Sequence, residues 1–305
     1  MINIKNTKMI GEAFVSAVSR LYGGATVEST TRLMGGVSAD VFKLVVRKAN
    51  GERASIVLRV HGETHSGHPA ALEFNLLRAL YAQGVAVPEP LLLDDSCKLL
   101  PYPFLLMAFM AGSTLIPSGG ENAYIEKLAS TLVDIHNLAT SELPALPIRT
   151  NPIPEVFDYL PTGASWQPLH DRLKALTNTD YSGQHKLLHG DYWPENILWK
   201  HGHPVAILDW EDAALGDPLA DVAAARVELR YKFGTAAMTR FTEAYAKGAA
   251  VDYQRLMLWQ VYVAAAAQCF MRQWGLPPEQ EAHMRKEALA SIQEAGDWLG
   301  QTNKS

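Results

Sequence analysis

One short segment, residues 187–199, constrains this chain of 305 residues more than any other. It contains His189, Asp191 and Asn196 in the order His-x-Asp-x-x-x-x-Asn, and an apolar stretch that ends in Asp209 follows it. Two hydrophobic segments separated by a few residues predict a hairpin, which would return Asp209 to the side of the loop. The spacing therefore predicts a fold in which two carboxylates and one amide meet.

These three side chains suit one kind of chemistry. The spacing is that of catalytic loops in enzymes that move the γ-phosphate of ATP. There the Asp191 carboxylate would accept the proton of an acceptor hydroxyl, while Asn196 and Asp209 would bind Mg²⁺. The alternative is an ordinary capped loop, which requires that the motif spacing and the downstream strand ending in Asp209 coincide by chance.

Composition indicates a soluble globular protein. Hydrophobic residues make up 48% and charged residues 19%, and the length favours two packed lobes. The net charge is −5 without any Lys/Arg-rich run, so the electrostatic footprint of a nucleic-acid binder is missing. We interpret the N-terminus as lacking a signal peptide and the apolar runs as too short to span a membrane. Cys97 and Cys269, far apart in apolar surroundings, favour a reducing cytoplasm.

The first third of the chain alternates between helical and strand patterns. Apolar residues at helical spacing predict a helix over residues 10–22, and short β-type segments predict several strands. The strands expected here are 26–33, 41–46, 54–60 and 91–94. A helix opened by Pro69 should lie between the last two strands. This order indicates a lobe with an antiparallel sheet, a leading helix and one further helix.

Two features of this lobe are candidates for phosphate contacts. Gly35, Gly36 and Ser38 occupy the turn between the first two predicted strands, where backbone N–H groups could lie over phosphate oxygens. Arg59, near the end of the third strand, could bind phosphate through its guanidinium fork, with Glu73 of the next helix as its partner. The plainer alternatives are a simple turn, a solvent-facing Arg and an acid that stabilises a helix N-terminus.

The apolar run 104–112 predicts a buried strand that leads into a hinge between lobes. Backbone groups of Ala108 and Met110 could hydrogen-bond the edge of an adenine ring, with Met107 and Phe109 closing on the ring itself. A plain core strand would have the same sequence. The hinge is therefore a hypothesis that depends on the motif downstream.

Helical periodicity dominates beyond residue 122. The expected helices cover 122–137, the segment after Asp217-Pro218, 251–274 and 279–296, with an irregular Pro-rich connection at 143–168. Asp217 should cap the helix that Pro218 opens, and Asp221 could brace the catalytic loop by accepting backbone N–H groups. His136 is interpreted as a packed helix-end residue rather than a ligand.

Other polar and aromatic residues leave alternatives open. His61, His65 and His68 suggest zinc, but no Cys or carboxylate pattern completes a tetrahedral site, so a polar loop is favoured. Glu211, Asp212 and the acids of 279–296 could line a pocket for a cationic acceptor or be solvated. Four aromatic residues could instead suit a sugar or a less polar alcohol: Tyr192, Trp193, Trp199 and Trp210.

Together these motifs resemble the aminoglycoside phosphotransferase family, within the group of kinase-fold small-molecule kinases that includes choline kinase and homoserine kinase-like proteins. The resemblance follows the family's order along nearly the whole chain. The matching segments are 35–38, 57–59, 73–80, 87–90, 110–112, the His189 loop, 207–210 and 216–221. It implies an α+β, protein-kinase-like bilobal fold, with a small β-rich N-lobe (residues 1–110) and a larger, mainly helical C-lobe (residues 111–305).

The resemblance also implies roles for the motif residues. Asp191 would be the catalytic base, Asn196 and Asp209 would bind Mg²⁺, and Arg59 would contact the phosphates of ATP or GTP, braced by Glu73. The acceptor would be a hydroxyl of a small molecule, such as an aminoglycoside-like antibiotic or a related metabolite. We expect a cytoplasmic monomer or homodimer that contacts neither nucleic acid nor membrane.

Two competing interpretations come from other classes. A nucleotide-binding scaffold without catalysis should have lost Asp191, Asn196 or Asp209, yet all three are present. A protein kinase should carry Asp-Phe-Gly and Ala-Pro-Glu segments, whereas this chain has Asp-Trp-Glu at residues 209–211 and no Ala-Pro-Glu afterwards. The small-molecule kinase therefore remains the leading hypothesis.

Overall fold

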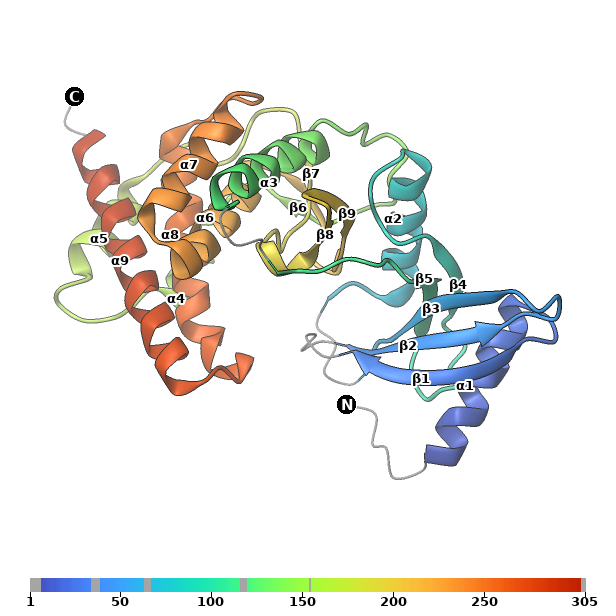
Figure 1. Ribbon diagram of the computed structural model, residues 1–305. Helices are drawn as coiled ribbons and strands as arrows, with labels where there is room; N and C mark the ends of the chain where they lie inside the picture. The colour runs from blue at the N-terminus through green and yellow to red at the C-terminus, as the bar shows by residue number, and fades with distance from the viewer. Residues whose placement is uncertain (1–6, 34–38, 63–66, 116–119, 154, 303–305) are drawn as a thin grey trace.

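The computed structural model describes residues 7–33, 39–62, 67–115, 120–153 and 155–302. A five-stranded sheet with two helices forms one part of the molecule, and a larger, mostly helical part lies beside it (Figure 1). This confirms the predicted α+β, kinase-like fold class. The candidate phosphate-turn residues Gly35, Gly36 and Ser38 lie outside the described residues, as does His65.

The N-lobe forms from the first seven elements of the chain. They are α1 (Thr7–Leu21), β1 (Thr26–Leu33), β2 (Asp40–Arg47), β3 (Arg53–Val60), α2 (Ala70–Ala82), β4 (Pro90–Asp94) and β5 (Phe104–Ala108). The strand order is β1-β2-β3-β5-β4, and every neighbouring pair is antiparallel. The predicted strands and both predicted helices are confirmed within a few residues.

Alternation along the strands sorts the N-lobe side chains onto two faces. Phe42 of β2 and Leu58 of β3 belong to the cluster that packs under α1, where the Phe14 and Phe42 rings are 5.1 Å apart. Because neighbouring residues of a strand point to opposite faces, Arg59 points away from α1. Its contact with Asp209 shows that this second face adjoins the C-lobe.

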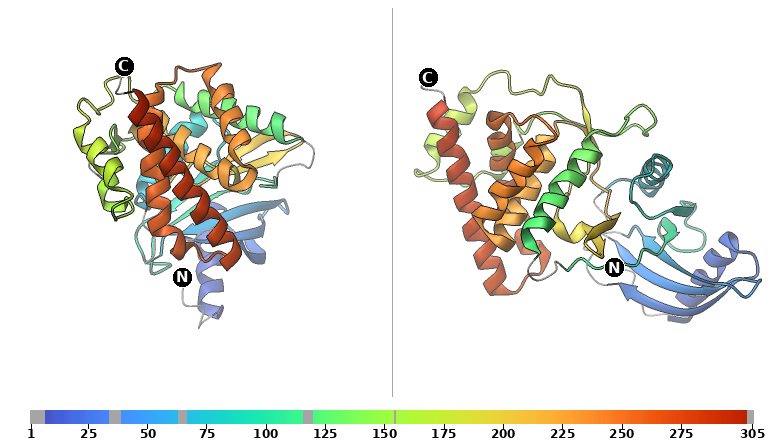
Figure 2. Two further views of the ribbon diagram at one scale, coloured as in Figure 1. Left: turned by 90° about the vertical axis from the view of Figure 1, so that its left-hand side faces the viewer. Right: turned by 45° about the horizontal axis from the view of Figure 1, so that its top comes forward.

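The C-lobe combines helices with short strands. Its helices are α3 (Glu121–His136), α4 (Val156–Tyr159), α5 (Gln167–Ala175), η2 (Pro194–Asn196), α6 (Leu219–Phe233), α7 (Thr235–Ala246), α8 (Tyr253–Phe270), η3 (Met271–Trp274) and α9 (Pro278–Thr302). Its strands are β6 (Ile148–Arg149), β7 (Lys186–Leu188), β8 (Ile197–Lys200), β9 (His203–Ile207) and β10 (Ala214–Gly216). Helices α6, α7, α8 and α9 pack together on the side remote from the N-lobe sheet (Figure 2).

The interpretation of residues 143–168 as irregular is partly wrong. The segment contains β6 and α4, and α5 begins at its end. Strand β6 is only two residues long, and it pairs in parallel with β10, which is more than sixty residues away in the chain. A strand of that length has too few residues to show an alternating pattern, so its partner, rather than its own sequence, defines it.

The lobes are joined by backbone hydrogen bonds as well as by the chain. Just past the N-lobe, Ser113 exchanges two backbone hydrogen bonds with Trp199 of β8, at 2.9 and 2.8 Å, and so fixes the chain that leaves β5 to this hairpin. The Ile207 N–H of β9 donates to the Ala86 carbonyl, which follows α2, at 2.7 Å. These bonds hold the β8–β9 hairpin against the N-lobe, so that Asp209, just after β9, lies between the two lobes.

Two further observations concern the surface. Cys97 and Cys269 are free and exposed, which corrects the expectation of apolar surroundings. Cys97 lies in the loop between β4 and β5, and Cys269 lies in the last turn of α8. Over the described ranges, no helix combines the length and the apolar character needed to cross a bilayer.

Candidate active site

A buried carboxylate holds the backbone of the predicted catalytic loop, residues 187–199. Asp221, in the first turn of α6, accepts hydrogen bonds from the N–H groups of His189 at 2.7 Å and Gly190 at 2.9 Å. His136, at the end of α3, lies 3.1 Å from the same carboxylate through Nε2, and its Nδ1 lies 2.8 Å from the Tyr245 hydroxyl. The predicted brace is therefore present, and His136 is the packed helix-end residue expected from the sequence.

His189 connects this loop to the segment that carries Asp209. Its Nε2 lies 2.8 Å from the Leu208 carbonyl, and its Nδ1 accepts the Asp191 N–H at 3.3 Å. Burial lowers the pKa of His189, although Asp221 opposes the shift, so the ring is neutral at pH 7 with its proton on Nε2. Leu208 in turn donates its N–H to the Asn196 carbonyl at 2.7 Å.

Asp191 projects from the loop with one carboxylate oxygen held in place. Its Oδ2 accepts hydrogen bonds from Asn196 Nδ2 at 3.0 Å and Trp193 Nε1 at 3.2 Å. The residue is exposed, so a substrate can reach it. The pKa of Asp191 is raised to about 7, first because the surrounding protein partly removes the carboxyl from water and then because Asp209 and Asp212 lie nearby.

Gly190 permits a close approach that brings Asp212 to the loop. Its φ is +86°, and a Cβ atom there would lie 2.0 Å from the Asp212 carbonyl oxygen. Any other residue would have to displace the backbone after Asp209. The His-Gly-Asp motif therefore needs glycine at its second position for a steric reason. The close approach also leaves the exposed Asp212 side chain beside Asp191.

Asp209 meets the cation of the N-lobe. Its φ of +63° is unusual for a residue with a side chain, and such conformations concentrate at functional sites. Arg59 Nη2 lies 2.9 Å from Asp209 Oδ1, and Arg59 Nε lies 3.3 Å from Glu73 Oε1, the partner predicted from the sequence. Glu211 also forms an ion pair with Arg59. Burial alone would lower the pKa of Arg59, but these three carboxylates together raise it.

The residues around Asp209 suit a hard divalent cation. Asn196 uses its amide nitrogen to bind the Asp191 carbonyl and carboxylate, which directs its amide oxygen away from Asp191. One amide oxygen and one carboxylate are the few protein ligands that Mg²⁺ takes when substrate phosphates complete its shell. Within the described ranges, no group of three or more His, Cys, Asp or Glu side chains could hold a metal by itself.

The hinge residues lie at the end of β5 and just beyond it, and one of their two amides is already used. The Ala108 N–H donates to the Glu89 carbonyl at 2.8 Å, so this amide is already used. The Met110 amide has no backbone partner within the described part of the chain. Met107 is buried beside β3, and Lys43 lies 3.8 Å above the Phe109 ring. The nucleotide roles of these residues stay predictions.

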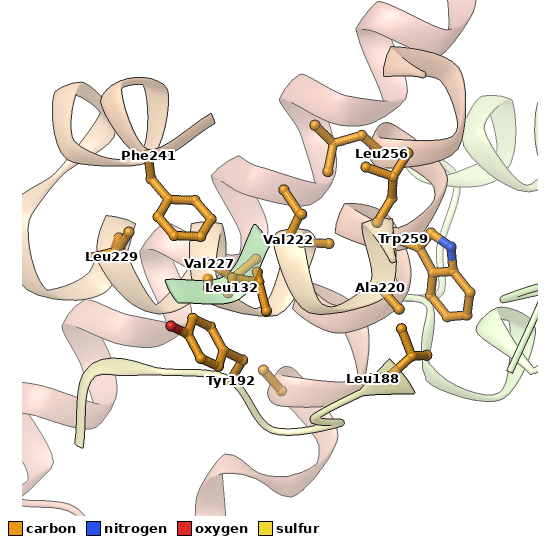
Figure 3. Close-up of a cluster of buried hydrophobic side chains, with 14 of the residues drawn as sticks. Leu132, Leu188, Tyr192, Ala220, Val222, Val227, Leu229, Phe241, Leu256 and Trp259 are labelled. Carbon is orange, nitrogen blue, oxygen red and sulfur yellow. The ribbon is translucent and has the colours of Figure 1, made fainter. Parts of the chain in front are cut away.

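The structure corrects the aromatic residues proposed for an acceptor pocket. Tyr192 and Trp210 are fully buried and Trp199 nearly so, because they pack in the C-lobe core. Tyr192 lies among Leu132, Val227 and other apolar side chains (Figure 3), and its hydroxyl donates to the Leu128 carbonyl. Of the four, Trp193 alone is partly exposed, and it contacts Asp191.

Of the acidic residues proposed for the same pocket, some form ion pairs and one remains exposed beside the loop. Glu211 is paired with Arg59 and is therefore no part of an acceptor surface, whereas Asp212 remains exposed beside the loop. In α9, Glu287 and Glu294 both bind Arg230 of α6. Sequence spacing could not show these pairs, because each joins segments more than fifty residues apart.

One carboxylate near the site was missed by the sequence interpretation. Glu228 lies on α6, one turn before Lys232, which pairs with Glu195 and lies 5.4 Å over the Trp193 ring. This face of α6 therefore borders the catalytic loop. The pKa of Glu228 is raised to about 8, first by burial and then by Asp191. The sequence did contain a signal for Glu228, because an acidic residue stands there among the Ala, Val and Leu residues of one helix.

Comparison with known proteins agrees with this geometry. Residues 29–259, which include Arg59 and the whole catalytic loop, match the model of the phosphotransferase enzyme family, abbreviated APH. Acyl-CoA dehydrogenase family member 10 of Mus musculus is 31% identical over 180 residues, which are 52% of this chain and 16% of that protein. The chain thus spans well under a quarter of that relative, whose name describes another activity.

Solved structures share the fold at low sequence identity. A protein of Ralstonia eutropha JMP134, provisionally described as an aminoglycoside phosphotransferase, superposes with a TM-score of 0.69 at 16% identity, covering 95% of this chain and 98% of its own. A thermostable mutant of aminoglycoside phosphotransferase APH(4)-Ia, in a ternary complex with AMP-PNP and hygromycin B, gives a TM-score of 0.63 at 17% identity, covering 93% and 99%.

Proposed function

Because the chain belongs to the phosphotransferase enzyme family, we propose that it moves the γ-phosphate of ATP to a hydroxyl group of a small molecule. One observation carries the proposal: the Asp191 carboxylate, the Asn196 amide and the Asp209 carboxylate converge beside Arg59 between the lobes. Phosphoryl transfer needs in-line positioning and neutralisation of charge more than a strong base. This arrangement offers both.

Asp191 is the group that would accept the acceptor's proton. Trp193 and Asn196 both donate to Oδ2, so Oδ1 is left to face an incoming hydroxyl. A pKa near the working pH suits a group that accepts a proton in one step and releases it to water afterwards. The brace from Asp221 keeps this carboxylate in position during the transfer.

The nucleotide would lie against the N-lobe. Arg59 would bind its phosphates, and Met110 and the apolar residues around it would bind its base. Asn196 and Asp209 would hold Mg²⁺, which when bound neutralises charge on the transferred phosphate. The APH(4)-Ia complex, which contains AMP-PNP and hygromycin B, supports a nucleotide and a small acceptor as the two substrates here.

The acceptor would approach from the side of Asp212 and Trp193. Both residues border Asp191, and Glu228 adds a second acid on this side. The exposed Asp212 carboxylate next to the reacting hydroxyl favours an acceptor that carries an amine, as in an aminoglycoside-like antibiotic or a related metabolite, and the Glu228 carboxyl, with its raised pKa, can accept or donate a hydrogen bond there. Neutral sugars and simple alcohols should be poorer substrates.

The test is a screen for ADP release from Mg-ATP with a panel of hydroxylated compounds, including amino sugars, neutral sugars and amino alcohols. With an active acceptor, Asp191→Asn should lower kcat by about 10²- to 10⁴-fold while ATP binding survives. Asp171→Asn, an exposed acid of α5 that bonds Gln167, is the matched control and should leave turnover unchanged. Normal turnover by Asp191→Asn would disprove the role of Asp191.

A further inference from the structure

The Arg59 side chain is surrounded by more negative charge than it can neutralise. Its Nη2 lies 2.9 Å from Asp209 Oδ1 and also binds Glu211 Oε2, while its Nε lies 3.3 Å from Glu73 Oε1. Arg59 and Glu211 each expose 8% of their surface. Three carboxylates around one guanidinium give a formal charge of −2, and His61, whose Nε2 lies 2.8 Å from Glu73 Oε2, adds a positive charge only when it is protonated. Asp209 and Glu211 compete for the one guanidinium.

The carboxylates compete for one nitrogen of the guanidinium, Nη2. Glu73 binds the Nε side of the guanidinium, whereas Asp209 and Glu211 share Nη2. A guanidinium binds phosphate through its terminal N–H groups. A phosphate that binds both terminal nitrogens of Arg59 must therefore displace a carboxylate from Nη2. Since Asp209 is needed for the metal, Glu211 is the partner without another assigned task.

The backbone of Glu211 is fixed to the segment that precedes α2. Its carbonyl accepts the His68 N–H at 2.8 Å, and His68 Nε2 lies 2.6 Å from the Ala213 carbonyl. A Cβ atom on Gly67 would lie 2.5 Å from the Glu211 Cβ, so the two backbones touch. Glu211 can therefore release Arg59 by rotating its side chain, but its backbone stays beside Arg59.

We propose that Glu211 is an intramolecular competitor that occupies the phosphate-binding fork of Arg59 and thereby sets the affinity for nucleotide. The inference rests on the proposed function, because it requires that Arg59 binds phosphate. It assigns Glu211 a specificity-determining role: a polyphosphate with enough charge displaces the carboxylate, whereas a weakly charged ligand does not. Segment 67–68 keeps Glu211 and Glu73 on the two sides of Arg59, so that the released guanidinium stays oriented.

The test compares ATP binding by wild type and Glu211→Gln, measured by calorimetry in EDTA so that no metal bridges the groups. Glu211→Gln keeps the shape of the side chain and removes its charge, so ATP should bind about tenfold more tightly. Glu211→Ala should show a gain at least as large, and it covers the case in which the Gln variant fails to fold. Glu281→Gln, which removes a carboxylate from an ion pair with Arg285, should change nothing.

A double-mutant cycle identifies the cause of the gain. In an Arg59→Met background, Glu211→Gln should improve ATP binding less than about threefold, because the fork for which Glu211 competes is gone. An equal gain without Arg59 would overturn the proposal in favour of general charge repulsion. Unchanged ATP affinity of Glu211→Gln and Glu211→Ala in EDTA would overturn it directly.

Three further outcomes can be told apart. Weaker binding of Mg-ATP by Glu211→Gln, with unchanged binding in EDTA, would assign Glu211 to the metal and overturn the competitor role. If neither wild type nor any variant binds ATP with or without Mg²⁺, the proposed function fails as well as the inference. Tight ATP binding by wild type with no effect at position 211 leaves the proposed function standing and removes only the inference.

Discussion

Two polar clusters flank Asp191, and they are built in opposite ways. Around Asp221, each carboxylate oxygen accepts one backbone N–H, His136 supplies a further contact, and every member belongs to the C-lobe. Around Arg59, one cation from the N-lobe meets acids from both lobes. The first cluster has a partner for each group, while the second has a surplus of acceptors.

The difference indicates which part of the site is rigid and which can exchange partners. A buried network in which each group is satisfied loses stability whenever one contact breaks. A cation shared among several carboxylates can change partners at little cost, because another acceptor is at hand. The catalytic loop therefore belongs to the rigid cluster, and nucleotide phosphates would enter the exchangeable one.

The largest effect should follow from Asp221→Asn. An Asn side chain offers one acceptor oxygen, so its NH2 group would face either the His189 or the Gly190 N–H without a bond. We expect a loss of about 3 kcal/mol in the free energy of unfolding and a fall of about 100-fold in kcat, because Asp191 is no longer positioned. Urea denaturation and steady-state turnover measure the two. Full activity in a destabilised variant would contradict the positioning role.

Arg59→Met tests the exchangeable cluster and should act mainly on binding. Loss of the guanidinium should weaken Mg-ATP affinity about 30-fold, measured by calorimetry. The free energy of unfolding should also fall, because Glu73 and Glu211 are left buried without their cation, so urea denaturation is measured beside ATP affinity. Arg59→Lys is the matched variant, and its point charge should restore part of the affinity. A stability loss larger than that of Asp221→Asn, with normal ATP binding, would reverse the assignment of the two clusters.

Tyr245→Phe should have the smallest effect, at the edge of the rigid cluster. It removes the hydroxyl 2.8 Å from His136 Nδ1 and leaves that buried nitrogen without its partner. We expect a loss of about 1 kcal/mol in the free energy of unfolding and less than a threefold change in kcat. Thermal or urea denaturation would show the loss. An unchanged unfolding midpoint would mean that His136 holds Asp221 without help from Tyr245.

Much of the architecture could be predicted because its signals are local. The N-lobe strands follow from alternation over eight residues, and the β8–β9 hairpin follows from two apolar runs joined by a short turn. The spacing of His189, Asp191 and Asn196 likewise places three side chains on one loop. Strand β6 and helix α4 were not predicted, because elements of two and four residues are too short to show periodicity.

The sequence by itself determined the kinase-like order of elements and the approach of Asp209 to the Asp191 loop, since both depend on patterns within short stretches. Only the tertiary structure decided that Glu211 pairs with Arg59 and that Trp199 and Trp210 belong to the core. The physical reason is that a side chain's partner and its exposure depend on segments that approach from elsewhere in the chain. Spacing along one segment carries no information about that approach.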